Sequence, residues 1–409
     1  MFLRVTLPLS GANFLNQAAR TVMAIVGPVL AVEFGLSASE LGLLAACMFA
    51  AYAVVQLPLG VALDVIGPRR MQTGLMLVAA AGFALFALSS GMTGFVVARV
   101  ILGVGISAWL MAIIKGNSQW FAPGQVAAMT GFAMAISGLG SVLATAPVEW
   151  VLPLVGWRGI FWMLCGISIA VAAWIFFSVA DKAAPGARRS LKEELAVMGG
   201  ILGSAKFWRY GPFAPMLSVI NFAYMGLWAG PWLRDVAGFD GATRAQVLLG
   251  YTLAALAGSL LIGQAASRAV AAGRSGFFVP LVCMGFVIAG QAGLACQPAM
   301  GAAVLGLWWM IAFFGAGGTA GYIAVNQLFP PELTGRVSTA SNTLTLGGAF
   351  LLQSAIGWIL DLFPRTAAGG WDPRGYSWAL VLTIVLQLLA TANLLGWGVA
   401  RESKATIRR

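Results

Sequence analysis

The sequence predicts an all-α integral membrane protein in which twelve transmembrane helices form two six-helix bundles. Three observations carry this prediction. First, 60% of the 409 residues are hydrophobic and 9% are charged, whereas about 25% of residues are charged in a typical soluble domain. Second, the apolar residues form long continuous runs. Third, one polar stretch, Asp181–Arg209, divides these runs into two sets of six.

Each apolar run is long enough to cross the hydrocarbon core of a bilayer, which needs about 20 residues in a helix. The first run is too long for the apolar region of a signal peptide, so we interpret it as the first span. The predicted spans cover residues 8–32, 40–63, 71–89, 95–114, 126–149, 160–179, 210–232, 244–266, 276–295, 302–328, 337–360 and 376–400.

The central polar stretch marks the boundary between the predicted bundles. We expect an N-terminal bundle at residues 1–181, a cytoplasmic linker at 182–206 and a C-terminal bundle at 207–409. The halves resemble each other, because Gly35-Leu36-Ser37 leads into the second span and Gly238-Phe239-Asp240 leads into the eighth. Parallel repeats of this kind place a binding site near the bilayer midplane, between the halves.

The basic residues predict the orientation in the membrane. Sixteen Lys and Arg residues fall between spans on the side of the two termini, and five fall on the other side. Cytoplasmic loops carry the excess of basic residues. We therefore expect a multi-pass protein of the cell (inner) membrane with both termini in the cytoplasm. The net charge of +11 reflects this pattern and does not indicate a nucleic-acid partner.

Several function classes lack the residues that they need. The chain has no histidine, and its four cysteines are not spaced like a metal or disulfide site. We therefore expect no metal, no cofactor and no enzymatic activity. A membrane-embedded enzyme would need clustered acids, His, Cys or a lipid-phosphate motif. The expected partners are the lipid bilayer and a small molecule, and the expected functional state is a monomer.

Two motifs carry a family resemblance. The loop after the second span reads Gly-Val-Ala-Leu-Asp-Val-Ile-Gly-Pro-Arg-Arg at residues 60–70, and the fourth span carries Arg99 followed by Gly103 and Gly105. Together they resemble the signature loop and the R-x-x-x-G-x-G element of the major facilitator superfamily. The resemblance covers the whole chain, but it does not identify a substrate. It implies a secondary transporter.

The resemblance also implies conformational roles. In the family, the loop after the second span holds the two halves together when the protein is open to the outside. A carboxylate at this place can meet the positive N-terminus of a neighbouring helix, and a plain basic cytoplasmic loop is the alternative. Arg99 is structural in the family's pattern. The predicted gating residues are Gly60, Asp64, Gly67, Arg69, Arg70 and Arg99.

A polar stripe in the first span is the main candidate for ligand binding. Asn13, Asn16, Gln17 and Arg20 recur at positions that share one face of a helix. Arg20 lies near mid-bilayer, where a charge is expensive and therefore a functional candidate. We expect the stripe to face a water-filled cavity. The alternative is an arginine satisfied by backbone carbonyls or by a neighbouring helix.

The second half offers neutral partners for the same cavity. Asn221, Tyr224 and Trp228 share a face of the seventh span, and Asn342 and Thr345 lie in the eleventh. These side chains suit hydrogen bonding and stacking against a polar organic molecule. The alternative for each is a hydrogen bond that joins two helices.

The positions of the acidic residues restrict the class of substrate that the sequence predicts. None of the 13 Asp and Glu residues lies in the middle of a predicted span. A cavity with an arginine and no acid favours an anionic or zwitterionic solute. The sequence thus predicts a secondary active transporter that moves a small polar organic solute by alternating access. The alternative is a multidrug or metabolite efflux transporter of the same superfamily.

Overall fold

The computed structural model of this chain describes residues 1–180, 191–299, 301–366 and 369–396. Among the described residues, 11 helices are long and apolar enough to cross a membrane, and a shorter apolar helix covers Ala128–Leu143. This arrangement confirms the predicted fold class and is compatible with twelve spans. The last predicted span covers residues 376–400, and its final residues, 397–400, lie outside the described part of the chain.

The first half contains α1 Thr6–Glu33, α2 Ala38–Ile66, α3 Pro68–Leu88, α4 Met92–Gly105, α5 Trp109–Trp120, α6 Pro123–Leu143 and α7 Ala146–Ser178. The second half contains α9 Ala205–Tyr210, α10 Phe213–Ala223, η2 Tyr224–Trp228, α11 Ala229–Asp235, α12 Gly241–Ala271, α13 Phe278–Ala295, α14 Gly301–Gly315, α15 Gly318–Asn326, α16 Thr334–Asp361 and α17 Pro373–Leu395. Between the halves lies α8 Leu191–Leu202. Short 3-10 turns occupy Phe2–Arg4 and Pro331–Leu333.

One predicted boundary is wrong. The fifth span was expected to reach Glu149, but α6 ends at Leu143 and Glu149 belongs to α7. Inside α7, Gly156 has φ +67°, so this helix changes direction there. The segments before and after Gly156 are both rich in apolar residues. Hydropathy alone therefore could not locate the bend.

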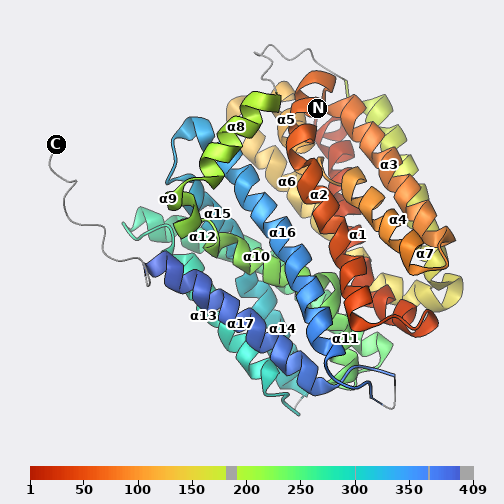
Figure 1. Cartoon of the computed structure of the whole chain (residues 1–409). Coiled ribbons are helices and arrows are strands. Elements are labelled where there is room, and N and C mark those ends of the chain that lie inside the picture. Colours follow the sequence, from red (N-terminus) through yellow and green to blue (C-terminus); the bar gives the residue numbers. More distant parts are fainter. Residues whose placement is uncertain (181–190, 300, 367–368, 397–409) are drawn as a thin grey trace.

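The two halves lie side by side (Figure 1). Helices α1 to α7 pack mainly among themselves, as do α10 to α17, and the halves meet where α2 packs on α16 and α1 packs on η2. We call the membrane side that carries the N-terminus and α8 the linker face, and the opposite side the far face. Helix α8 packs against both α2 and α16 on the linker face.

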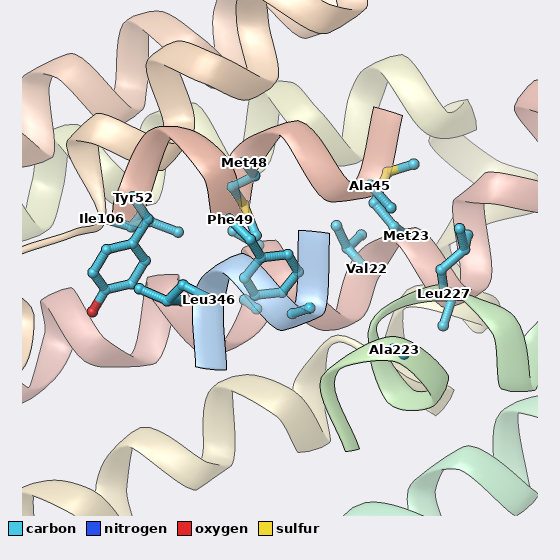
Figure 2. Packing of buried hydrophobic residues seen from close by; sticks show 14 of the residues in the cluster. Val22, Met23, Ala45, Met48, Phe49, Tyr52, Ile106, Ala223, Leu227 and Leu346 are labelled. Atoms are coloured by element: carbon cyan, nitrogen blue, oxygen red, sulfur yellow. The ribbon is translucent and has the colours of Figure 1, made fainter. Parts of the chain in front are cut away.

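Buried apolar side chains fill the junction between the halves (Figure 2). Phe49 and Tyr52 of α2 lie close to Leu346 of α16, and Leu227 of η2 lies near α1. Close packing of this kind needs no water-driven hydrophobic effect inside a bilayer, because van der Waals contact supplies the attraction.

Candidate functional site

A cavity of about 1380 Å³ lies between the two halves. At the linker face its wall includes Met198 of α8, Glu332 and Arg336, and its deeper wall includes Arg20 and Asn221. On the far face the halves are in direct contact, because the start of α2 is hydrogen-bonded to Asp361 at the end of α16. The cavity therefore opens towards the linker face.

Arg20 lies at the middle of α1. It is 14 residues from Thr6 and 13 residues from Glu33, which is about 20 Å from either end at 1.5 Å per residue. Its side chain is 9% exposed and lines the cavity. This position places a guanidinium at the depth where a bilayer is least polar.

Aromatic rings surround the Arg20 guanidinium. Its Cζ atom lies 4.6 Å from the centroid of Phe222, 5.4 Å from that of Phe49 and 5.5 Å from that of Tyr52. These are distances at which a cation is attracted to the face of a ring. Nε is buried without a hydrogen-bond partner, and no hydrogen bond joins Arg20 to another residue of the described chain. The rings therefore attract the guanidinium without accepting a hydrogen bond from its N–H donors.

The rest of the α1 stripe divides into two groups. Asn13 and Gln17 line the cavity. Asn16 does not, which corrects the prediction for this residue. Asn16 is fully buried, and its Nδ2 donates to Asn13 Oδ1 at 3.1 Å. It therefore orients Asn13 instead of facing the cavity.

Two pairs of neutral side chains face Arg20's cavity from the second half. Tyr251 Oη donates to Asn221 Oδ1 at 2.5 Å, and both residues line the cavity. Thr345, also in the lining, is hydrogen-bonded to the hydroxyl of Tyr322. Each hydroxyl and amide retains further donor or acceptor capacity. The second half thus presents hydrogen-bonding groups without a formal charge at these positions.

Asn342 forms a bridge between the halves. Its Nδ2 donates to Oε1 of Gln56, on α2, at 3.0 Å, and both residues line the cavity. Gln56 is 5% exposed, so its amide depends on this partner or on a ligand. Relative motion of the halves would break this bond.

Two predicted ligand residues lie elsewhere. Tyr224 is buried, and its hydroxyl is 3.2 Å from Thr383 Oγ1 of α17. Trp228 donates from Nε1 to the carbonyl of Gln353 at 3.1 Å, on the closed side of the molecule. Neither lines the cavity. Both form hydrogen bonds that join helices, as in the alternative interpretation of these residues.

The sequence analysis missed much of the cavity wall, including the polar residues Gln56, Tyr52, Tyr251 and Tyr322. The sequence carried a signal for the three tyrosines. The chain holds only six tyrosines, and a tyrosine inside an apolar run combines a greasy ring with a hydroxyl that needs a partner. Gln56 carried a similar signal as an amide in the second span.

The predicted gating residues of the loop after α2 have different local environments in the structure. Gly67 joins α2 to α3 in a tight turn, and its φ of +86° is a conformation that glycine adopts without strain. Arg69 donates from Nε to the carbonyl of Phe176 at 2.7 Å, and Arg70 is exposed. The side chain of Asp64 lies outside the described residues. A side chain at Gly60 would meet only Met111 Sδ at 3.6 Å, so Gly60 is not a site of close helix approach here.

Arg99 is fully enclosed by backbone. Its guanidinium donates to the carbonyls of Ala19 at 3.1 Å, Leu44 at 3.2 Å and Ala45 at 3.4 Å. These carbonyls belong to α1 and α2, so Arg99 ties α4 to both. This geometry agrees with a structural role. Among the described residues, no group of three or more His, Cys, Asp or Glu side chains could hold a metal ion.

A family model of the Major Facilitator Superfamily matches residues 9–353. The match covers most of the 409 residues, including both halves of the cavity wall. The chain belongs to the major facilitator superfamily.

Solved structures of other transporters share this superfamily fold. A bacterial homolog of the human lysosomal transporter Spinster, in an inward-facing and unoccupied conformation, superposes with a TM-score of 0.78 at 17% identity and covers 95% of each chain. A D-xylose-proton symporter superposes with a TM-score of 0.71 at 14% identity and covers 98% of each chain. At these identities the likeness concerns the fold alone.

Curated relatives of this superfamily member are named as transporters of organic acids. The probable L-galactonate transporter of Escherichia coli (strain K12) is 31% identical over 41% of this chain and 37% of its own length. The hexuronate transporter of that strain is 27% identical over 40% of this chain and 38% of its own length. In these matches the chain thus spans less than half of each relative. A putative tartrate transporter of Agrobacterium vitis is 24% identical over 87% of this chain and 83% of the relative.

Proposed function

We propose that this protein is a secondary active transporter of small hydroxylated organic anions, with sugar acids as the favoured class. The observation that carries the proposal is the unpaired guanidinium of Arg20 at the deep wall of the cavity. A buried charge needs a partner, and a substrate carboxylate is the partner that also explains a binding site. Arginine presents a planar fork that matches a carboxylate with two parallel hydrogen bonds.

The neutral wall supports hydroxyl groups on the substrate. Asn221, Tyr251, Asn342 and Thr345 offer amides and hydroxyls opposite the arginine's half of the cavity. A site built to hydrogen-bond a hydroxyl discriminates strongly against an analogue that lacks it, because buried polar groups are then left unpaired. A hydroxylated carboxylate would satisfy both walls. The substrates named for the curated relatives, L-galactonate, hexuronate and tartrate, belong to this chemical class.

The proposed cycle is alternating access, in which the halves 1–181 and 207–409 rock around the cavity. We infer that the linker face is cytoplasmic, because basic residues concentrate on that side. The protein would then sit in the inner membrane, as a monomer, with both termini in the cytoplasm. In this orientation the cavity described above is open inwards. Closing it would bring the loop with Asp64, Arg69 and Arg70 towards the start of α16.

Efflux of drugs or apolar metabolites is a second candidate. The observation that favours it is the aromatic share of the wall, with Phe49, Trp109 and Phe222 among the lining residues. Three of the rings nearest Arg20 are already engaged with its guanidinium. The two candidates separate by charge, because a cationic drug would be repelled by Arg20.

Uptake into proteoliposomes tests the proposal. Purified protein would be assayed with radiolabelled galacturonate, galactonate and tartrate, with neutral hexoses as controls, and with a cationic dye as the efflux probe. We expect saturable uptake of at least one acid and none of the neutral sugars. Transport of the dye together with failure of every acid would contradict the proposal and favour the second candidate.

A further inference from the structure

Two antiparallel helices, α2 from the first half and α16 from the second, pack on each other at the closed far face. Helix α2 begins at this face with Ala38, and α16 ends there with Asp361. The positive end of one helix therefore lies beside the carboxylate at the end of the other. Helix N-termini attract negative charge, because their first N–H groups lack partners within the helix.

Asp361 binds this N-terminus directly. Its Oδ1 accepts a hydrogen bond from Ala38 N at 2.8 Å, and its Oδ2 accepts one from Ser39 N at 2.8 Å. The other free groups are satisfied within α2 itself, since Ser37 Oγ accepts from Glu40 N at 3.1 Å and Glu40 Oε2 accepts from Ser37 N at 2.8 Å. The first half thus satisfies two of these N–H groups itself, and Asp361 of the second half satisfies the other two, those of Ala38 and Ser39.

Glycines allow the backbones to meet at this place. A Cβ added to Gly357 of α16 would lie 2.4 Å from the carbonyl oxygen of Ala38. A Cβ added to Gly42 of α2 would lie 2.7 Å from the carbonyl oxygen of Gln353. The approach is reciprocal, with one glycine on each helix. Contact this close fixes the position of Asp361 relative to the N-terminus of α2.

The internal repeat gives a second carboxylate in the corresponding place. Glu149 follows the fifth span as Asp361 ends the eleventh. One of its carboxylate oxygens lies 2.0 Å from the Cβ position of Gly241, the first residue of α12. Glu149 also attracts Arg244 of the same helix. Each half therefore places a carboxylate at a helix N-terminus of the other half, although only Asp361 receives hydrogen bonds from it.

We propose that Asp361 is a latch that holds the far face closed while the cavity is open at the linker face. We call the contact of its carboxylate with the N–H groups of Ala38 and Ser39 the far-face latch. When the halves rock and the far face opens, these donors lose the carboxylate and turn to water. The latch therefore favours the conformation described here and sets the balance between the two open states.

The far-face latch mirrors the role expected of Asp64. Asp64 lies near the end of α2 at the linker face, close in sequence to the turn at Gly67, and α16 begins at that face with Thr334. The same two helices would then exchange carboxylates at opposite faces in alternate states. This inference rests on the alternating access of the proposed function, but it does not depend on the substrate being an anion.

Distance measurements between spin labels test the latch. One label goes on Cys296, which is exposed at the end of α13, and the other on Leu88→Cys, at an exposed position of α3 on the far face. Cys47, Cys165 and Cys283 are buried and react poorly with the label. Pulsed electron resonance then reports closed and open far faces as short and long distances.

The test variant is Asp361→Asn, which keeps the size of the side chain. It removes the charge and turns an amide N–H₂ towards one of the two backbone donors. We expect the ratio of long to short distances to rise by about 2- to 30-fold, the range of a carboxylate at a helix N-terminus. The matched control is Asp372→Asn. Asp372 caps α17 by accepting from Arg374 N at 2.8 Å, entirely within the second half, so this variant should leave the ratio unchanged.

Three results would overturn the proposal. An unchanged distance ratio in a folded Asp361→Asn protein would exclude the latch. An equal shift in Asp372→Asn would reduce it to a general loss of capping. A far face that stays closed in every sample, with and without substrate, would overturn alternating access as well. Failure of anion uptake with an intact shift in Asp361→Asn would instead remove only the substrate class.

Discussion

Two arginines are buried in the first half, and their surroundings differ. Arg99 is 1% exposed and donates to three backbone carbonyls of α1 and α2. Arg20 is 9% exposed, is covered by aromatic rings and forms no hydrogen bond to another described residue. Burial alone therefore does not separate the two arginines. Their hydrogen bonds do, because the donors of Arg99 are satisfied by backbone carbonyls and the buried Nε of Arg20 has no partner among the described residues.

The comparison predicts opposite consequences for the same kind of substitution. Removing Arg20 should affect transport and leave the fold intact. Removing Arg99 should affect the fold, because carbonyls in two helices lose their donors. The following predictions test this contrast, starting with the largest expected effect.

Arg20→Ala should abolish uptake of the anionic substrate. Loss of one partner of a desolvated charge pair costs roughly 2–5 kcal/mol, which is about 30-fold or more in the dissociation constant. Thermal unfolding of the purified variant should stay close to that of the wild type, because no described residue loses a hydrogen bond. Uptake in proteoliposomes and an unfolding scan of one preparation measure both. Normal uptake, or a collapsed fold, would break the comparison.

Arg99→Ala should destabilise the protein. The carbonyls of Ala19, Leu44 and Ala45 would each lose a hydrogen bond from a charged donor, and such a bond is worth roughly 1.5–3 kcal/mol. We expect lower yield and a lower unfolding temperature. Any protein that remains folded should retain substrate affinity, because Arg99 does not line the cavity. Stability equal to that of the wild type would contradict the structural assignment.

Arg20→Lys tests whether the site needs the two parallel donors of an arginine or only its positive charge. The charge remains, but a lysine ammonium cannot present two parallel donors to a carboxylate. Binding should weaken by about tenfold or more, because one hydrogen bond between charged groups is worth roughly 1.5–3 kcal/mol. Titration calorimetry with the substrate measures the change. Equal affinity would show that Arg20 acts as a point charge only.

Tyr251→Phe tests the neutral wall and should have the smallest effect. It removes the hydroxyl that donates to Asn221 Oδ1 at 2.5 Å and keeps the ring. A net hydrogen bond is worth roughly 0.5–1.5 kcal/mol, so the apparent KM should rise by about 2- to 12-fold. The rise should be larger for a hydroxylated acid than for an acid without hydroxyls. A uniform change across both acids would indicate loss of positioning instead of hydroxyl recognition.

The sequence predicted the fold because bilayer thickness sets the length of each apolar run. The sequence also placed Arg20, Asn13 and Gln17 on one face of the first span, and all three line the cavity, because 3.6-residue spacing defines a face within one straight helix. The same reasoning misplaced Trp228. The span is interrupted by the π-helical turn Tyr224–Trp228, and a wider turn rotates later side chains away from the expected face.

Contacts between distant helices could not be read from spacing. The Gln56–Asn342 bond joins residues 286 positions apart, and its existence depends on how α2 crosses α16. Asn16 shows the same limit on a smaller scale. It shares a face with Arg20, but the position of α6 and its neighbours decides which part of that face meets water.

The most direct test of the account compares a matched pair of ligands. Binding of galacturonate and of galactose, which differ in a carboxylate, would be measured by titration calorimetry on the wild type and on Arg20→Ala. We expect the wild type to prefer the acid by about 30-fold or more and Arg20→Ala to lose this preference. An equal preference in both proteins, or binding of the neutral sugar alone, would contradict the assignment of Arg20 as the anion-binding residue.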